Sequence, residues 1–368
     1  MSDRSIPWRA PKIGGGEYAL VRDVLDSNYL NEGDVTTRFE REIAALVGAR
    51  HAVATTSGTT ALFLAMAALG IGHGDEVIVP DLTFIASANA VKLTGATAVL
   101  ADVDPATLTL CPEAFERAIT SRTRAVMPVH VSGRGANMAA IGAIAKARGI
   151  PIVEDAAEAL TSRAGGKPLG TIGIAGCLSF SPNKTITTGQ GGMVLTDDDA
   201  VHGRLRELKD HGRPVRGTGG DDVHHSVGFN FKLTNLQAAV GLGQLAYVRE
   251  RLDRQKRNYE LYARGLDGLD GLRLPGFDLA GGEVPLWTDA VVERRDALDR
   301  YLESRGMHCR RFWFPLHTQA PYRQPDDRFP GALQAGPRAL WLPSAFTLTD
   351  QDVERVVAAV REFLTGAN

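Results

Sequence analysis

Short apolar runs and helical patterns alternate along the first half of the chain. After two helices at residues 16–26 and 35–47, apolar runs at 51–55, 76–80, 98–101, 125–131 and 150–154 have the length of buried strands. Helical spacing fills the intervals, at residues 85–93, 112–119 and 138–148. This alternation predicts an α/β fold with a mostly parallel sheet and helices on both faces.

The second half of the chain has a different pattern. Thr234 and Gln237 form a capping box, which predicts the start of a long helix that reaches about Leu266 and bridges two domains. A glycine-rich stretch at 265–282 follows, and the last helix is expected at 350–364. We therefore expect a large domain over residues 1–250 and a smaller C-terminal α+β domain over 251–368. The glycine- and proline-rich segment 213–222 is expected to be a loop near the mouth of the site.

Composition narrows the class of protein. The 368 residues carry 41 Lys and Arg against 43 Asp and Glu, a net charge of −2, which does not favour nucleic-acid binding or a basic membrane-binding patch. The three cysteines are widely spaced, which is typical of reduced thiols and not of a disulfide frame or a metal site. The N-terminus has no apolar leader segment, and no run approaches the length of a membrane helix. We expect a cytoplasmic protein.

Three features of the sequence point to pyridoxal phosphate as cofactor. Lys184 follows a short strand in a Thr- and Gly-rich turn, where a lysine is a candidate Schiff-base nucleophile. Asp155 directly follows the run 150–154, where a strand would deliver a carboxylate able to keep a pyridine nitrogen protonated. The small-residue loop 55–60 opens a helix, and the N-terminus of a helix binds phosphate. An isolated lysine is usually a solvated surface residue, so the combination carries the inference.

The chain is identified at these residues as a member of the DegT/DnrJ/EryC1/StrS family of sugar aminotransferases, a resemblance that covers nearly its whole length. The matching segments include Gly70-Ile-Gly-His-Gly-Asp-Glu-Val-Ile-Val-Pro80, Thr83-Phe-Ile-Ala-Ser-Ala-Asn89, Glu154-Asp-Ala-Ala-Glu158 and Gly228-Phe-Asn-Phe-Lys-Leu-Thr-Asn-Leu-Gln-Ala-Ala239. Within the family, the segments 85–89, 154–159 and 183–184 most resemble the GDP-perosamine synthases.

The resemblance implies a fold type I, aspartate aminotransferase-like architecture and a set of site residues. Lys184 and Asp155 are the expected catalytic residues. Family dehydratases carry His at the lysine position, so Lys184 favours amino transfer. The residues expected to bind the cofactor are Ser57, Gly58, Thr59, Phe84, Asp155, Glu158, Ser179, Asn183, Lys184 and Asn230. Asn230 would come from the partner subunit, so that a homodimer carries composite active sites. The residues expected to bind substrate are His317, Arg311 and Lys232, with His130 as a weaker candidate.

The implied reaction is pyridoxal-phosphate-dependent amination of a nucleotide-linked 4-keto-6-deoxy sugar, of the GDP-4-keto-6-deoxymannose type, with L-glutamate as amino donor. Aminotransferases for 3-keto sugars or aminocyclitol ketones, and a cofactor-binding regulatory protein, stay open as alternatives. An NAD-binding enzyme is excluded as an alternative, because no Gly-x-Gly-x-x-Gly motif follows a predicted strand. Gln190 and the segment 132–135 depart from the family pattern near the pocket, which leaves the exact substrate open.

Overall fold

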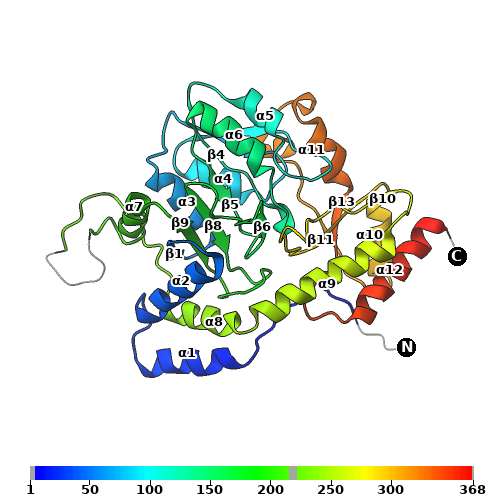
Figure 1. Ribbon diagram of the computed structural model, residues 1–368, viewed down its shortest axis with the longest axis horizontal. Coiled ribbons are helices and arrows are strands. Elements are labelled where there is room, and N and C mark those ends of the chain that lie inside the picture. The colour runs from blue at the N-terminus through cyan, green and yellow to red at the C-terminus, as the bar shows by residue number, and fades with distance from the viewer. Residues whose placement is uncertain (1–4, 215–221, 367–368) are drawn as a thin grey trace.

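A seven-stranded central sheet organises the larger part of the molecule (Figure 1). The computed structural model describes residues 5–214 and 222–366, so most of the predicted loop 213–222 lies outside the described residues. In spatial order the strands are β1 (His51–Thr55), β9 (Gly192–Thr196), β8 (Ala175–Ser179), β5 (Val153–Asp155), β4 (Thr123–Val126), β2 (Glu76–Pro80) and β3 (Thr97–Ala101).

The sheet is mostly parallel, as predicted. The parallel bridges Val126–Ile152 and Val129–Asp155 connect β4 to β5 and so join two groups of strands into one sheet. Strand β9 pairs antiparallel with both β1 and β8, while the other described pairs in this sheet are parallel. The carboxyl ends of β5 and β8 therefore meet at the same edge of the sheet.

Both faces of the sheet are covered because its strands are apolar on both sides. On β2, Val77 and Val79 pack into one hydrophobic cluster and Ile78 packs into another on the opposite face, as the two-residue period of a strand requires. All three side chains are fully buried, and each such burial contributes about 1.5–3 kcal/mol. The helices that flank the sheet are α2 (Asp34–Val47), α3 (Gly58–Ala68), α4 (Ala86–Leu93), α5 (Pro112–Ala118), α6 (Met138–Arg148) and α7 (Asp199–Lys209).

Three predicted elements differ from the structure by more than one residue. Strand β5 begins at Val153 instead of Ile150. Strand β4 ends at Val126 instead of Val131, because Pro128 lacks the N–H that would continue the ladder. The predicted long helix after Thr234 is two helices, α8 (Asn235–Leu245) and α9 (Val248–Leu266), although the capping box of Thr234 and Gln237 is confirmed. At the break, the Tyr247 hydroxyl donates to the carbonyl of Gly14, before helix α1 (Gly16–Asp26).

The C-terminal part contains a second, antiparallel sheet. Its strand order is β10 (Leu272–Arg273), β11 (Thr288–Val292), β13 (Ala339–Leu342) and β12 (Arg310–Arg311). Helices α9, α10 (Arg295–Glu303) and α12 (Asp350–Thr365) enclose a core of their own with this sheet, and in Figure 1 α9 runs from the larger part toward it. The smaller elements are the hairpin β6 (Arg163–Ala164) and β7 (Lys167–Pro168), and helix α11 (Pro330–Ala335). The α+β character agrees with the sequence; the division at residue 250 stays a prediction.

The N-terminal segment lies against this C-terminal sheet. Ile6 forms a parallel bridge with Met307, and its side chain joins the C-terminal core. The indole of Trp8 lies 5.3 Å from that of Trp287 and 5.9 Å from that of Trp341, measured between ring centroids. These contacts bring residues 8–10 beside the cavity described next.

Candidate active site

Lys184 projects into a cavity of about 470 Å3 at the carboxyl edge of the central sheet. It follows β8 in a short turn, and its side chain is 11% exposed. Its Nζ donates to Oε1 of Glu158 at 3.2 Å and lies 4.9 Å from the ring centroid of Trp287. Arg251 of α9 is buried and donates to the carbonyl of Thr185 at 2.9 Å, which fixes the turn behind the lysine. Lys184 is thus an amine held inside a pocket and not a solvated loop residue.

Asp155 lies at the end of β5 and faces the same cavity. Its Oδ2 accepts from the Ser87 hydroxyl at 2.7 Å and its Oδ1 accepts from the N–H of Ala157 at 3.1 Å. Burial raises the pKa of this carboxyl, against the lowering effect of these two bonds and of the Lys184 charge. Among the described residues Asp155 forms no ion pair. A cationic ring nitrogen would supply the missing partner, because it would stabilise the buried carboxylate.

Glu158 connects Lys184 to the rest of the pocket wall. It follows the Glu154-Asp-Ala-Ala turn, and its Oε2 accepts from the N–H of Ser132 at 2.8 Å. Burial raises its pKa, while Lys184 acts in the opposite direction. Its carboxylate therefore depends on the charge of Lys184 for stabilisation.

The predicted phosphate seat is formed where α3 begins. Ser57 is the N-cap, and its Oγ accepts from the N–H of Thr60 at 3.1 Å while the Thr60 hydroxyl accepts from the N–H of Ser57. A Cβ on Gly58 would come within 2.9 Å of the Cβ of Ser179, so only glycine lets the helix start approach the end of β8 so closely. Ser57, Gly58, Thr59 and Ser179 all line the cavity. The positive end of the α3 dipole and these hydroxyl groups suit a phosphate.

Phe84 and Asn183 complete the set of expected residues that the structure brings together. Phe84 lines the cavity with 53% of its surface exposed, so one face of the ring is available to a flat ligand. Asn183 lines it next to Lys184, and its Oδ1 accepts from the Ser181 hydroxyl at 2.7 Å. The donor set fits pyridoxal phosphate: a phosphate seat, an aromatic face, a buried carboxylate and a lysine amine.

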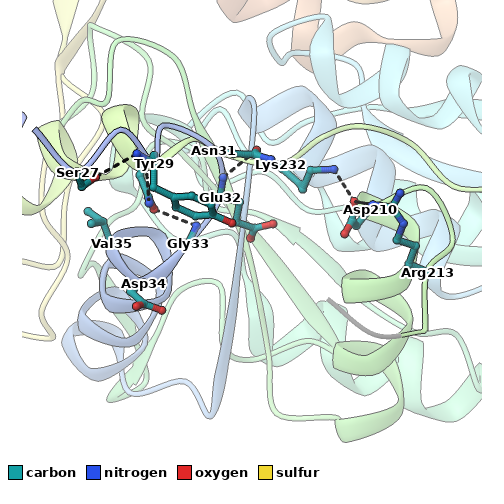
Figure 2. Close-up of a pocket in the computed structure, with 11 residues that line it drawn as sticks. Ser27, Tyr29, Asn31, Glu32, Gly33, Asp34, Val35, Asp210, Arg213 and Lys232 are labelled. Atoms are coloured by element: carbon teal, nitrogen blue, oxygen red, sulfur yellow. Dashed lines mark hydrogen bonds and ion pairs between the residues drawn. The ribbon is translucent and has the colours of Figure 1, made fainter. Parts of the chain in front are cut away.

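Asn230 and Lys232 lie elsewhere in the chain. Asn230 is exposed, does not line the cavity, and its backbone forms an antiparallel bridge with Asp210. The Lys232 ammonium is paired with the Asp210 carboxylate. Figure 2 shows this pair in a second cavity of about 690 Å3, beside Arg213 and opposite the loop that carries Tyr29 and Glu32. Within one chain, neither residue reaches the pocket of Lys184.

Two residues predicted to bind substrate do not face the cavity. His317 is fully buried. Asp81, the residue after β2, accepts from its backbone N–H at 2.7 Å, and an Asp81 carboxylate oxygen lies 2.6 Å from its Nδ1. Its ring stacks on Phe329 at 4.4 Å. Arg311 is exposed and paired with Asp299 at 3.0 Å. Neither His317 nor Arg311 lines the cavity within one chain, and their contacts with substrate stay predictions.

Sequence reasoning missed the arginines and tryptophans that form the far wall. Arg9, Arg310, Trp287, Trp313 and Trp341 line the cavity. On β12, Arg310 is opposite Trp341 in the ladder and Arg311 is opposite Leu340. Because successive strand residues point to opposite faces, Arg310 shares the cavity face with Trp341 and Arg311 does not. The double arginine was visible in the sequence, but its register was not.

The residues that depart from the family pattern, and His130, differ in where they lie relative to the cavity. Gln190 lines the cavity, whereas the segment 132–135 lies behind it. The Ser132 hydroxyl donates to Asp289 at 2.7 Å and accepts from Trp341 Nε1 at 3.0 Å, so this segment links Glu158 to the C-terminal sheet. His130 is fully buried with its Nε2 2.9 Å from Glu154 and its Nδ1 accepting from the N–H of Ala136, which assigns it a structural position.

Comparisons with known proteins match this geometry to a family of enzymes. The family model described as the DegT/DnrJ/EryC1/StrS aminotransferase family matches residues 11–361. The chain is 39% identical to GDP-perosamine synthase of Caulobacter vibrioides, over 96% of this chain and 97% of that protein. It is 35% identical to GDP-perosamine synthase of Escherichia coli O157:H7, over 97% and 98%.

A solved structure agrees with the fold. The structure of DesI in the presence of its TDP-sugar product superimposes on this chain with a TM-score of 0.91 at 32% identity. The match covers 100% of this chain and 94% of the DesI chain. The predicted fold class, that of fold type I pyridoxal-phosphate enzymes, is confirmed. Within residues 5–214 and 222–366, none of the helices combines the length and the apolar character that crossing a membrane requires.

Proposed function

We propose that this chain, an enzyme that belongs to the DegT/DnrJ/EryC1/StrS aminotransferase family, aminates a nucleotide-linked 4-keto-6-deoxy sugar with pyridoxal phosphate as cofactor and L-glutamate as amino donor. The observation that carries the proposal is the amine of Lys184 in one cavity with the buried carboxylates of Asp155 and Glu158 and the capped start of α3. Each of these groups has a separate task in amino transfer.

When bound, pyridoxal phosphate supplies the aldehyde that carries the amino group and a ring that withdraws electrons from the donor's α-carbon. Asp155, buried at the end of β5, would hold the proton on the ring nitrogen. Ser57, Gly58, Thr59 and Ser179 would bind the phosphate, and Phe84 would cover the ring and exclude water.

Lys184 performs the proton transfers. Its Nζ takes a proton from the α-carbon of the donor as general base and returns one as general acid. Glu158, 3.2 Å from that Nζ, orients the amine inside the cavity. In the second half-reaction the same groups act in reverse order on the ketosugar, so one pocket serves both substrates in turn.

We propose a GDP-linked sugar as substrate because two relatives at 39% and 35% identity are named GDP-perosamine synthases. DesI, whose structure was determined in the presence of its TDP-sugar product, is 32% identical, so the identity of the nucleotide is a finer proposal than the reaction class. We further propose a homodimer in which Asn230 completes the partner's site. This is supported by the exposure of Asn230 and its position outside the cavity of its own chain.

In the test, the holoenzyme is incubated with glutamate and one of three ketosugars. These are GDP-4-keto-6-deoxymannose, the TDP-linked 4-keto-6-deoxyglucose and a 3-keto sugar nucleotide. We expect mass spectrometry to detect an amine in place of the ketone with the GDP-linked 4-ketosugar, and 2-oxoglutarate to form in equal amount. Lys184→Ala should abolish the product, while Lys167→Ala, an exposed lysine outside the cavity, should leave it unchanged. Amination of the 3-keto compound alone would contradict the proposed substrate.

A further inference from the structure

Two buried hydroxyl groups form a chain that ends on Asp155. Ser87, in the first turn of α4, is fully buried, and its Oγ donates to Oδ2 of Asp155 at 2.7 Å. Thr83, which is 1% exposed, places its Oγ1 3.0 Å from the Oγ of Ser87. Among the described residues, Ser87 provides the one side chain that hydrogen-bonds to Asp155. Ser87 does not line the cavity, so its effect on a ligand there must pass through its neighbours.

The direction of these hydrogen bonds depends on whether Asp155 is ionised. An ionised carboxylate only accepts, so the single proton of the Ser87 hydroxyl must point to Asp155, and Thr83 must donate to Ser87. If Asp155 is protonated, its own O–H can donate to Ser87, which then donates to Thr83 or to the carbonyl of Phe84, 3.3 Å away. Both forms of Asp155 are therefore satisfied. The ionised form gains more, because a hydrogen bond to a charged acceptor is stronger.

The charged groups around Asp155 do not replace this hydrogen bond. Burial raises the pKa of the Asp155 carboxyl, and the bond from Ser87 is the largest of the effects that lower it. Lys184 and His130 also lower the pKa, but they do so by charge and without a side-chain hydrogen bond to Asp155. The Lys184 ammonium donates to Glu158 instead. The orientation of the Asp155 carboxylate therefore depends on Ser87 and not on its charged neighbours.

Ser87 also closes the turn that carries Phe84. The N–H of Ser87 donates to the carbonyl of Phe84 at 3.2 Å. Phe84 and Asp155 both line the cavity, but they come from different segments of the chain, one just before α4 and the other at the end of β5. One buried residue therefore bonds to both the aromatic segment and the carboxylate. This link fixes the position of the Asp155 carboxylate relative to the segment that carries the Phe84 ring.

Resting on the proposed function, we propose that Ser87, oriented by Thr83, is a positioning residue that holds the Asp155 carboxylate in place for the ring nitrogen of pyridoxal phosphate. The N–H of Ala157 holds Oδ1 at 3.1 Å and the Ser87 hydroxyl holds Oδ2 at 2.7 Å, so both oxygens of the carboxylate are fixed. A protonated ring nitrogen is stabilised by an ionised carboxylate, whereas a ring carbon at the same place is not. The contribution of Ser87 should therefore depend on whether the ligand has that nitrogen.

The test compares two ligands of the cofactor-free protein. One is pyridoxal phosphate, and the other is its analogue in which a C–H group replaces the ring nitrogen while the aldehyde and the phosphate remain. Absorbance titrations give a dissociation constant for each, and the ratio of the two constants is the preference for the ring nitrogen. The wild type should prefer pyridoxal phosphate. Ser87→Ala should lower this preference by roughly 5- to 10-fold, the difference between a hydrogen bond to a charged acceptor and one to a neutral acceptor.

Two control measurements separate positioning from a general effect on the fold. Thr94, at the other end of α4, donates its hydroxyl to the carbonyl of Val91 at 2.8 Å and does not line the cavity. Thr94→Val therefore removes a hydroxyl from the same helix and should leave the preference unchanged. In the Asp155→Asn background, Ser87→Ala should not change the preference further, because Ser87 acts through the Asp155 carboxylate.

Two results would overturn the inference: Ser87→Ala keeps the wild-type preference, even if it binds both ligands more weakly, or it lowers the preference as much in the Asp155→Asn background. If Ser87→Ala does not fold, Thr83→Val keeps Ser87 and removes the donor behind it. It should lower the preference by roughly 2- to 5-fold, and an unchanged preference there would also overturn the inference. A wild type that binds both ligands equally would instead contradict the proposed function, because Asp155 would not hold the ring nitrogen.

Discussion

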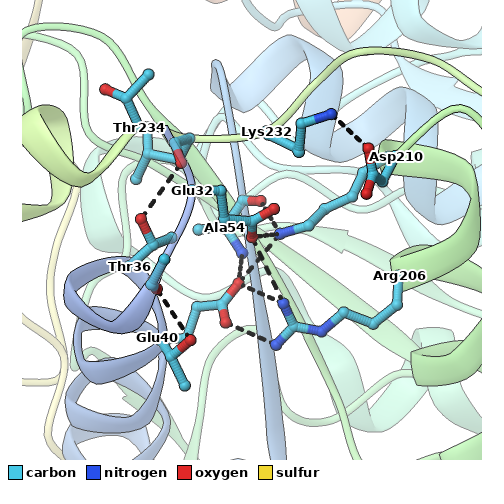
Figure 3. Close-up of polar contacts among 12 residues, drawn as sticks. Glu32, Thr36, Glu40, Ala54, Arg206, Asp210, Lys232 and Thr234 are labelled. Atoms are coloured by element: carbon cyan, nitrogen blue, oxygen red, sulfur yellow. Dashed lines mark hydrogen bonds and ion pairs between the residues drawn. The ribbon is translucent and has the colours of Figure 1, made fainter. Parts of the chain in front are cut away.

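Replacing Lys209 by Met is expected to destabilise the protein through a buried ion cluster. Its other members, Glu32, Glu40 and Arg206, are labelled in Figure 3. The side chain of Lys209, at the end of α7, is 2% exposed. Its Nζ lies 2.5 Å from Oε1 of Glu32 and 3.2 Å from Oε1 of Glu40, and donates to the carbonyl of Ala54 at 2.9 Å. Arg206 is the second cation, with its Nη2 2.6 Å from Glu40. The two acids and two bases balance in charge.

The size of the destabilisation follows from the two buried carboxylates that lose the Lys209 charge. Without Lys209, two carboxylates that are each less than 5% exposed share only Arg206, which is 29% exposed and lies 3.8 Å from Glu32. Removing one partner of a buried ion pair typically costs about 3–5 kcal/mol. Adding Glu32→Gln to Lys209→Met restores the balance of charge and should recover about 2 kcal/mol. Arg38→Met, which breaks an exposed pair on α2, should cost less than about 0.5 kcal/mol.

The dependence on pH has a definite sign. Burial acts to raise the pKa of Glu40, but Lys209, Arg206 and the N–H of Ala54 outweigh it and hold the pKa below the ordinary value of 4.5. The stabilisation is therefore present above pH 4.5 and is lost as the pH falls through the folded-state pKa. The difference between wild type and Lys209→Met should be largest near neutral pH and should shrink in acid.

Urea unfolding of the cofactor-free protein at pH 7 and at about pH 4 measures both effects. Because Lys209 holds the carbonyl of Ala54, at the end of β1 just before the phosphate seat, the variant should also lose cofactor more readily on dialysis. A loss below about 1 kcal/mol at pH 7, or an equal loss at both pH values, would refute the reasoning that the cluster is a coupled buried network.

Two further predictions concern the cofactor site. The raised pKa of Asp155 means that its favourable contribution in the cofactor-free chain is present below its ordinary value of 3.8 and is lost as the pH rises through the folded-state pKa. Asp155→Asn should therefore raise the melting temperature without cofactor at pH 7 while most transamination is lost; a lower melting temperature would contradict this. Mixing inactive Lys184→Ala with inactive Asn230→Asp subunits should restore activity, up to roughly half of wild type per mixed dimer, because one of its two sites escapes both lesions. Free subunit exchange without recovery would place Asn230 in its own chain's site.

Local patterns in the sequence predicted most of the regular elements. The helices at 16–26 and 138–148 and the strands at 51–55 and 76–80 have the predicted bounds, because caps, glycines and apolar periodicity act over a few residues. The break between α8 and α9 was not predictable, since it depends on the contact of Tyr247 with Gly14, more than two hundred residues away. The end of β4 near Pro128 could have been read from the sequence.

The residues of the candidate site also divide into those that local motifs predicted and those that depend on contacts between distant parts of the chain. Residues that belong to continuous motifs, such as the Ser57 cap, Asp155 and Lys184, lie together in the cavity as expected. The far wall depends on how β12 pairs with β13 and on how the N-terminal segment crosses the C-terminal sheet. For this reason the sequence could not show that Arg310, and not Arg311, lines the cavity. The contact that buries His317 against Asp81 is likewise between residues far apart in the chain.

The most direct test of the account is to identify the lysine that holds the cofactor. Borohydride reduction of the holoenzyme, followed by peptide mapping, should place a pyridoxyl label on Lys184. Lys184→Ala should show neither label nor transamination, although Ser57, Asp155 and Phe84 remain to bind the cofactor non-covalently. Lys167→Ala should be labelled at Lys184 like the wild type. A label on another lysine, or transamination that survives Lys184→Ala, would contradict the central claim.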